Sequence, residues 1–199
     1  MAKDFETVAS TPYQKPLWNY NLGRNLGNGG AFLPIDGSLN VALGTNLPTG
    51  TLLYVNLSNR QAYAVKNALV LAGGTTSAPR VDKRHLFVAN DVVFVSGAAV
   101  TITSIDSSNS AYDVFTLSGA CAGAIEGSYL EYGVAAGADP VVKYKPNIVL
   151  QERVLDVQGG ERLSCTAWIF EDVNTSKFPF VISPLRLADL NATGRYLMF

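Results

Sequence analysis

Charged side chains are scarce in this chain of 199 residues. Asp, Glu, Lys and Arg make up 16% of it, and the formal net charge is -1. An average soluble domain has roughly 25% charged residues. The basic residues occur singly or in pairs, so the sequence lacks the positive stripe that binds a nucleic-acid backbone or an anionic membrane surface. We therefore expect no nucleic-acid partner and no membrane partner.

Long apolar runs are missing as well. No stretch approaches the roughly 18 consecutive apolar residues that suggest a membrane-spanning helix, and the N-terminal residues lack the apolar part of a secretion signal. Residues 47–51, Leu-Pro-Thr-Gly-Thr, approximate a cell-wall sorting signal, but Thr49 and Gly50 come one position early and lie in mid-chain. We expect a protein that is made in the cytoplasm and stays soluble.

Side chains that perform most enzyme chemistry are few. His85 is the only histidine, and the charges of Lys83 and Arg84 beside it disfavour the imidazolium that a general base becomes. The plain alternative is a surface ring at the start of a strand. Carboxylate pairs can cleave glycosides without histidine, but no spacing distinguishes a pair among the scattered acids. These acids include Glu126, Glu131, Glu152, Asp156 and Glu161. Without a phosphate-binding or dinucleotide-binding motif, we expect no enzyme and no cofactor.

Cysteine is rare, with only Cys121 and Cys165. Neither has a second Cys or His at the spacing of a metal site, and a disulfide-stabilised secreted scaffold would contain more cysteine. Residues 106–113, Asp-Ser-Ser-Asn-Ser-Ala-Tyr-Asp, lack the Gly and the terminal Glu of an EF-hand calcium loop. We predict buried free thiols, leave a disulfide between the two cysteines open, and expect no metal site.

The first 46 residues differ from the rest of the chain. They contain the Gly-Asn repeats of residues 21–30 and show neither a strand period nor a helix period. Such a segment folds poorly alone, yet its aromatic residues are of the kind enriched at interface cores. We interpret residues 1–46 as an extended N-terminal arm; the alternative is a loop-rich edge packed on its own domain. The candidate interface residues in this arm are Tyr13, Trp18, Tyr20 and Phe32.

From Leu47 onward, short runs of β-branched and aromatic residues alternate with turn residues. The regular spacing of these turns is typical of an all-β barrel or sandwich. We predict such a domain over residues 47–137, with the turn at residues 48–50 leading into its first strand. Residues 135–142 indicate a hinge of small residues, and a β-rich C-terminal part follows over residues 138–199.

One helix is predicted within this C-terminal part, over residues 183–194. Ser183 is a suitable N-cap, Pro184 a suitable first helical residue, and Gly194 a suitable end. The rest of the chain favours strands, so the predicted fold class is all-β.

Some predicted strands are apolar on both faces. Val100 and Ile102 lie on one face of residues 100–105 and Ile105 on the other, if the alternation is regular. A strand of this kind fits a core on one side and a neighbouring subunit on the other, or a tightly packed sandwich. We favour the oligomer.

Three stretches carry a resemblance to a known family. They are LPTGTLLYV followed by RQAYAVKNALVL; RVDKRHLFVANDVVFVSG followed by ITSIDSSNSAYDVFTLSGA; and YKPNIVLQERVLDV with AWIFED, FPFVISPLRL and YLMF. Together they resemble the head fibre proteins of tailed bacteriophages, notably of crAss-like gut phages, and more distantly small capsid decoration proteins.

The resemblance implies a non-enzymatic virion protein on the outer capsid surface, made in the host cytoplasm. Its partners would be the major capsid protein and further copies of itself, typically in a homotrimer. The arm with Tyr13, Trp18, Tyr20 and Phe32 would then contact the capsid or another subunit. The chain lacks a long fibrous or lectin-like addition. The alternative function is a carbohydrate-binding or receptor-binding β module of a phage tail or a cell surface.

Overall fold

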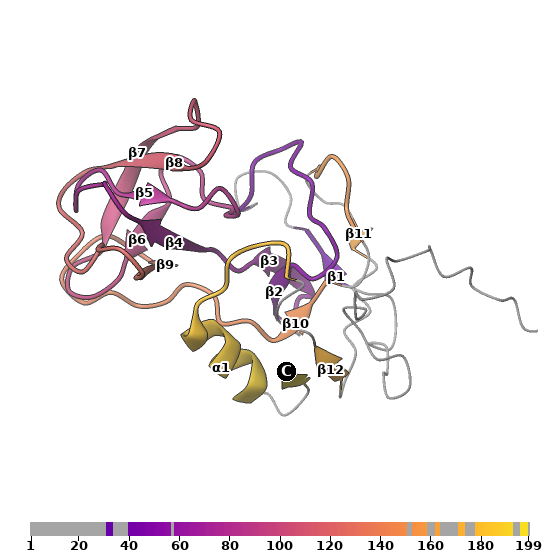
Figure 1. Cartoon of the computed structure of the whole chain (residues 1–199). Coiled ribbons are helices and arrows are strands. Elements are labelled where there is room, and N and C mark those ends of the chain that lie inside the picture. Colours follow the sequence, from indigo (N-terminus) through magenta and orange to yellow (C-terminus); the bar gives the residue numbers. More distant parts are fainter. Residues whose placement is uncertain are drawn as a thin grey trace, which may run out of the picture.

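In the computed structural model, the regular elements of the described residues are β-strands with one short helix (Figure 1). The structure describes residues 31–33, 40–56, 58–150, 153–158, 162–163, 171–173, 178–192 and 196–198. Its main parts are a closed six-stranded barrel and a five-stranded sheet. The predicted all-β fold with a barrel is confirmed.

The barrel is formed by one continuous part of the chain. Its strands are β4 (Asn67–Leu71), β5 (Arg80–Val81), β6 (Val92–Phe94), β7 (Val100–Asp106), β8 (Asp113–Leu117) and β9 (Tyr129–Tyr132). They follow the order β4-β5-β8-β7-β6-β9, and antiparallel pairing of β9 with β4 closes the barrel. Closure leaves the barrel without an unpaired sheet edge.

The apolar side chains of β7 reach the barrel core through a bulge. The pairing with β8 shifts by one residue between Ile102 and Ser104, and such an extra residue changes the face to which later side chains point. Val100 and Ile102 are buried before the bulge, and Ile105 packs against the same core after it. The apolar residues on both nominal faces of this strand therefore enter one core, without a second subunit.

The five-stranded sheet is assembled from distant parts of the chain. Its strands, in spatial order, are β10 (Ile148–Val149), β2 (Leu52–Asn56), β3 (Gln61–Ala64), β1 (Ala31–Phe32) and β11 (Arg162–Leu163). β1 runs parallel to β3, and the other neighbours are antiparallel. The prediction that the strand after Gly50 belongs to the barrel is wrong, because this strand is β2.

Both faces of β2 are covered within the chain. Leu53 and Val55 join the core on one face, together with Leu33 and Val41 from the N-terminal part. Leu52 lies in a separate apolar cluster on the other face with Phe178 and Leu190. A continuous apolar run is expected for a strand buried on both faces.

The turn that precedes β2 forms as predicted. The backbone N–H of Thr51 donates to the Pro48 carbonyl over 3.2 Å, and Gly50 has a φ of 92°. Glycine adopts this left-handed conformation without a Cβ clash.

The helix α1 (Pro184–Ala192) also begins where it was predicted to begin. The Ser183 hydroxyl accepts a hydrogen bond from the backbone N–H of Arg186 over 3.2 Å, which is the contact of an N-cap. Gly194 lies outside the described residues. A short parallel pair of strands, β12 (Glu171–Val173) and β13 (Tyr196–Met198), completes the described elements.

The stretch predicted as a hinge, residues 135–142, instead belongs to an excursion of the chain over residues 133–142 that is hydrogen-bonded to the barrel. Its two sides are joined by a backbone bond of 2.9 Å from the N–H of Val134 to the carbonyl of Val141. Gly137 exchanges two further backbone bonds with Ala99, of 2.8 and 3.1 Å. The backbone bond between Val134 and Val141 makes this segment resemble a hairpin, and the bonds between Gly137 and Ala99 fix it to the barrel.

Candidate functional site

Polar and charged side chains are buried together at several places around the barrel. One group surrounds His85, whose side chain is 6% exposed. Its Nε2 lies 3.0 Å from Asp113 Oδ2, and its Nδ1 accepts a bond of 3.2 Å from the backbone N–H of Phe87. The alternative of a surface ring is therefore wrong: Asp113, 28 residues further along, draws the ring inward.

The His85 site is suited to structure rather than to proton transfer. Because Nδ1 accepts from a backbone donor, the proton of the neutral ring lies on Nε2 and points to Asp113. Burial lowers the pKa of His85, although Asp113 opposes this shift. With both ring nitrogens engaged, no nitrogen is free to accept a proton from a substrate.

Asp113 has a cation on its other side. Lys83 Nζ lies 2.7 Å from Asp113 Oδ1. Burial acts to raise the pKa of Asp113, but hydrogen bonds from Lys83, Ser107 and His85 outweigh it and lower the pKa. The carboxylate therefore stays charged and holds the segment after β5 against the start of β8.

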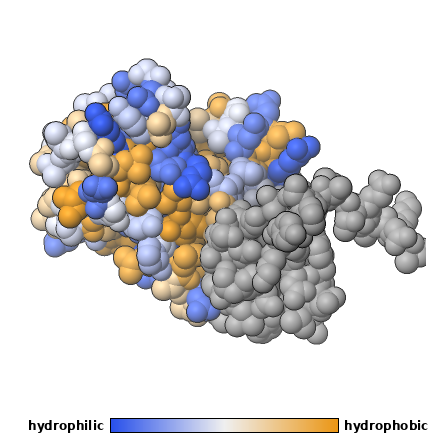
Figure 2. Space-filling model, in the orientation of Figure 1, coloured by the Kyte–Doolittle hydropathy of each residue, from blue (hydrophilic) through white to orange (hydrophobic). Residues whose placement is uncertain are grey.

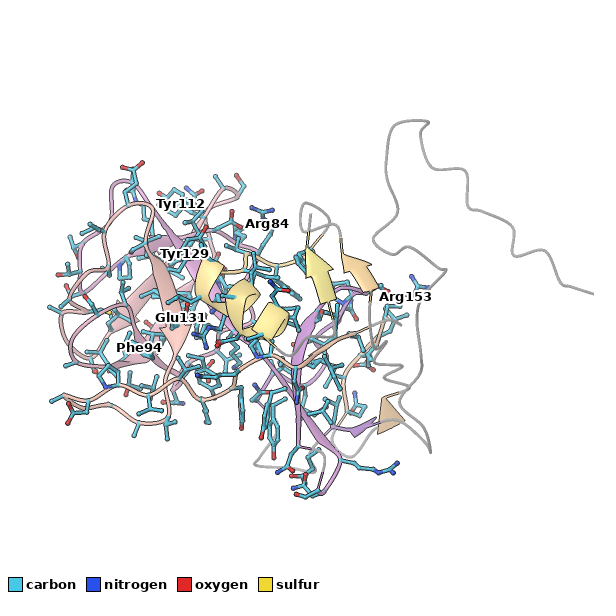
Figure 3. All side chains as sticks on the ribbon, turned by 90° about the horizontal axis from the view of Figure 1, so that it is seen from below. Arg84, Phe94, Tyr112, Tyr129, Glu131 and Arg153 are labelled. Carbon is cyan, nitrogen blue, oxygen red and sulfur yellow. The ribbon has the colours of Figure 1, made fainter. Side chains whose placement is uncertain are left out.

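A second group joins α1 to the barrel. Glu131 on β9 accepts a hydrogen bond of 2.7 Å from the Asn67 amide and another from the Ser183 hydroxyl. Arg186 Nε lies 3.3 Å from the same carboxylate, and Arg186 Nη1 lies 2.8 Å from Asp189. Figure 3 shows Glu131 beside the helix. Burial raises the pKa of Glu131, while Ser183 and Arg186 oppose the rise. Glu131 faces an arginine, so it anchors the helix.

The other acids considered for glycoside chemistry do not complete a pair with Glu131. Glu126 and Asp156 are exposed. Glu152 and Glu161 lie outside the described residues. In the described ranges, no group of three or more His, Cys, Asp and Glu side chains could hold a metal ion.

A third group is centred on Lys66, in the connection between β3 and β4. Its Nζ lies 2.6 Å from Asp91 Oδ2, and the two side chains are 0% and 8% exposed. The Tyr132 ring lies next to it, with its centroid 4.9 Å from Nζ. Our sequence reasoning missed this site. The signal was a lysine inside the apolar run YAVKNALVL, since lysine is almost never fully buried unless it is paired.

Tyrosines join the barrel to the five-stranded sheet. Tyr54 and Tyr63 face each other across β2 and β3, and the Tyr144 ring stacks on both, at 5.5 and 4.5 Å between centroids. Tyr132 of the barrel is 6.0 Å from Tyr144. Burial, together with the other two tyrosines, raises the pKa of Tyr144 to about 12. Tyr132 is buried, whereas Tyr54, Tyr63 and Tyr144 are half-buried and form a small aromatic surface beside the junction.

The predicted interface residues fall mostly outside the described ranges. Tyr13, Trp18 and Tyr20 lie there entirely, and for Phe32 only the backbone is described. Phe32 belongs to β1, where it pairs with Gln61 on one side and Arg162 on the other. This end of the predicted arm is thus part of the sheet.

The cysteines give no sign of reactive chemistry where they are described. Cys121 is free and fully buried in the barrel core, and this burial raises its pKa. A raised pKa disfavours the reactive thiolate. Cys165 lies outside the described residues.

Membrane insertion through a helix has no support in the described part of the chain, where no helix is long and apolar enough. Comparisons of the chain with protein-family models, with curated proteins and with solved structures give no match.

Proposed function

We propose that this chain is a non-enzymatic structural protein of a tailed-phage virion, a head fibre or decoration protein on the outside of the capsid. Its proposed partners are the major capsid protein and copies of itself. The sequence resemblance supports this proposal. The buried titratable side chains agree with it, because they bond to partners inside the fold. These side chains are His85, Asp113, Glu131 and Lys66.

The observation that carries the proposal is the set of large apolar side chains left at the surface. Each is more than half exposed: Leu43 63%, Ile125 65%, Val134 55%, Val141 62%, Leu155 56% and Leu185 64%. Figure 2 shows apolar patches between polar ones on the visible face of the described part. Single exposed apolar residues are ordinary, so the Val134 and Val141 pair is the best candidate contact.

These two valines lie opposite each other on the excursion formed by residues 133–142. The excursion is held to the barrel through Gly137 and Ala99. A preorganised apolar projection loses little conformational freedom when it binds, which favours association. We assign this projection to the capsid or to a neighbouring copy of the chain.

The test is binding of the purified protein to capsids assembled from the corresponding major capsid protein. We expect the protein to sediment with the capsids, and we expect the double variant Val134→Ser and Val141→Ser to bind at least tenfold more weakly. Ile125→Ser is the matched control, because Ile125 is equally exposed but lies elsewhere. Absence of the protein both from sedimented capsids and from purified virions would refute the proposal.

Oligomerisation is tested separately by sedimentation of the free protein. A homotrimer would have about three times the 21.2 kDa mass of one chain. Removal of residues 1–30 should leave the number of chains in the oligomer unchanged if the arm serves capsid docking. A monomer would contradict the trimer while leaving a monomeric decoration protein consistent with capsid binding.

A carbohydrate-binding function is the second candidate, and the tyrosine cluster favours it. Half-buried aromatic rings on a sheet, such as Tyr54, Tyr63 and Tyr144, offer an apolar face beside polar hydroxyl groups. Binding on a glycan array that is lost in Tyr144→Ala would support this candidate. An array without binding would count against it.

A further inference from the structure

Lys66 and Asp91 have the geometry of two groups that can react with each other. The Lys66 nitrogen lies 2.6 Å from Asp91 Oδ2. Lys66 is held in the connection between β3 and β4, and Asp91 directly precedes β6. Their positions differ by 25 residues, so the contact is a product of the tertiary fold. A fixed close approach of this kind favours a reaction strongly over the same reaction between free groups.

The surroundings also favour the uncharged form of Lys66. Burial lowers the pKa of Lys66 and the positive Lys143 acts in the same direction, although Asp91 opposes both. In a buried site, a proton transferred from the ammonium to the carboxylate leaves a neutral amine beside a neutral acid. The first is a nucleophile and the second an electrophile.

The carboxyl group of Asp91 is held for attack by the backbone. The N–H of Val88 donates to Asp91 Oδ2 over 2.9 Å, and a backbone donor at this oxygen stabilises the negative charge that develops when a carbonyl is attacked. Tyr132 closes the site with its ring near Nζ. Burial keeps the pKa of Tyr132 well above its ordinary value, so its hydroxyl stays protonated.

We propose that Lys66 and Asp91 condense to form an intramolecular isopeptide bond. The Lys66 nitrogen attacks Cγ of the protonated Asp91 carboxyl group, and a new N–C bond forms. One C–O bond then breaks, and the oxygen leaves as water with the carboxyl proton and one proton from the nitrogen. No oxidant, metal or cofactor takes part. This inference is independent of the proposed capsid function.

The product satisfies the site better than the ion pair does. A buried ion pair carries a large desolvation cost, whereas an amide has no net charge. Its carbonyl oxygen keeps the bond from Val88, and its N–H lies against the Tyr132 ring. The bond would covalently join the connection between β3 and β4, where the sheet meets the barrel, to the segment before β6.

A second lysine–aspartate contact in the same molecule provides an internal control. Lys83 lies 2.7 Å from Asp113, almost as close as the first pair, but its side chain is 34% exposed. Because Lys83 is partly exposed, an amide there would remove less buried charge, and hydrogen bonds to Asp113 lower the pKa of that carboxyl group. We therefore expect no bond at this pair.

The experiment is intact-mass spectrometry of the full-length protein under denaturing conditions, followed by proteolytic peptide mapping. We expect the main species to lie below the sequence mass by one water molecule, with a branched peptide that contains both Lys66 and Asp91. Lys83 and Asp113 should occur in separate peptides. A protein at full sequence mass, with Lys66 and Asp91 in separate peptides, would overturn the proposal.

Two variants sharpen the result. Lys66→Arg keeps the positive charge but cannot condense under these conditions, so this variant should have the full mass of its own sequence. Lys83→Arg should still lie one water molecule below the mass of its sequence. A missing water that maps to a single peptide would indicate a cyclic imide at an aspartate and would overturn the proposal. If Lys66→Arg does not fold, the branched peptide of the unaltered protein still decides the question.

Discussion

The barrel and the five-stranded sheet differ in how far apart in the sequence their strands lie. All six barrel strands come from residues 67–132, whereas the sheet takes strands from residues 31–32, 52–64, 148–149 and 162–163. Contacts that are close in sequence form early and at low entropic cost, and distant ones do not. We therefore expect the barrel to be the unit that forms first and the sheet to depend on it.

The two regions also differ in how they satisfy buried polar groups. The barrel closes on itself, and its buried charges lie around Lys66, Asp113 and Glu131. In the sheet, two asparagines bond the backbone as an additional strand would. Asn40 bonds both the N–H and the carbonyl of Ala64, and Asn147 does the same with Val55. In the open sheet, asparagine side-chain amides therefore satisfy backbone N–H and carbonyl groups. In the closed barrel, pairing with neighbouring strands satisfies them.

The largest effect should come from a cavity in the barrel core. Phe115→Ala removes a fully buried ring that makes edge contacts with His85 and Phe87, and we expect a loss of about 3–5 kcal/mol in unfolding free energy. Urea unfolding with hydrogen exchange is the measurement. If the sheet depends on the barrel, the amides of β2 and β3 should lose protection together with those of the barrel.

Leu53→Ala is the matched change in the sheet core, because Leu53 is also fully buried. We expect it to lower the protection of β2 and β3 while most barrel amides keep theirs. Equal losses in both regions for both variants would contradict the proposed dependence of the sheet on the barrel.

The comparison also explains which parts of the fold were predictable. The turn at residues 48–50 and the start of α1 depend on neighbouring residues, and both were predicted correctly, as was the all-β class. Membership of the barrel depends on pairing between distant residues. β2 and β7 look alike as runs of apolar residues, yet β2 is covered on both faces and β7 reaches one core through a bulge.

The sites were less predictable than the strands. His85 was interpreted from its neighbours Lys83 and Arg84, but Asp113 and the ring of Phe115 determine its environment. Lys66 stands out as a lysine inside an apolar run, but its partner could not be identified without the fold, because nothing in the sequence connects it to Asp91. Local patterns report local structure, whereas a buried charge is explained by a partner that the chain brings from elsewhere.

A smaller effect is expected when the helix anchor is broken. Arg186→Met leaves Glu131 buried without its cation, and removal of one partner of a buried pair costs about 3 kcal/mol or more. Loss of hydrogen-exchange protection should be concentrated in α1. The double variant Arg186→Met and Glu131→Met should recover part of the stability; no recovery would contradict a direct ion pair.

The asparagine contacts of the sheet provide the next test. Asn40→Ala leaves the N–H and the carbonyl of Ala64 without this partner, and we expect a loss of about 1–3 kcal/mol. Asn59→Ala is the control, since Asn59 bonds near the surface. Thermal unfolding of the two variants measures the difference. A similar midpoint for both would show that Asn40 does not stabilise the sheet.

The smallest expected effect is a pH dependence that belongs to the barrel alone. Burial lowers the pKa of His85 below its ordinary value of 6.5, against the opposing Asp113 and Asp82 and with a small contribution from Lys66. The unfolded chain therefore binds a proton more readily than the folded chain. The stability that His85 contributes is complete above about pH 6.5 and is lost as the pH falls through the lowered value.

Urea midpoints between about pH 7.5 and pH 5.5, where histidine titrates, measure this contribution. The unaltered protein should lose stability over this range, and His85→Gln should lose less, whatever its stability at the upper pH. In the unaltered protein, β5 and β8 should lose hydrogen-exchange protection before β2 and β3, because Asp113 and Phe115 contact the ring. A slope that is the same in both proteins would mean that carboxylates alone set the pH dependence, and the barrel and the sheet would then not differ in this respect.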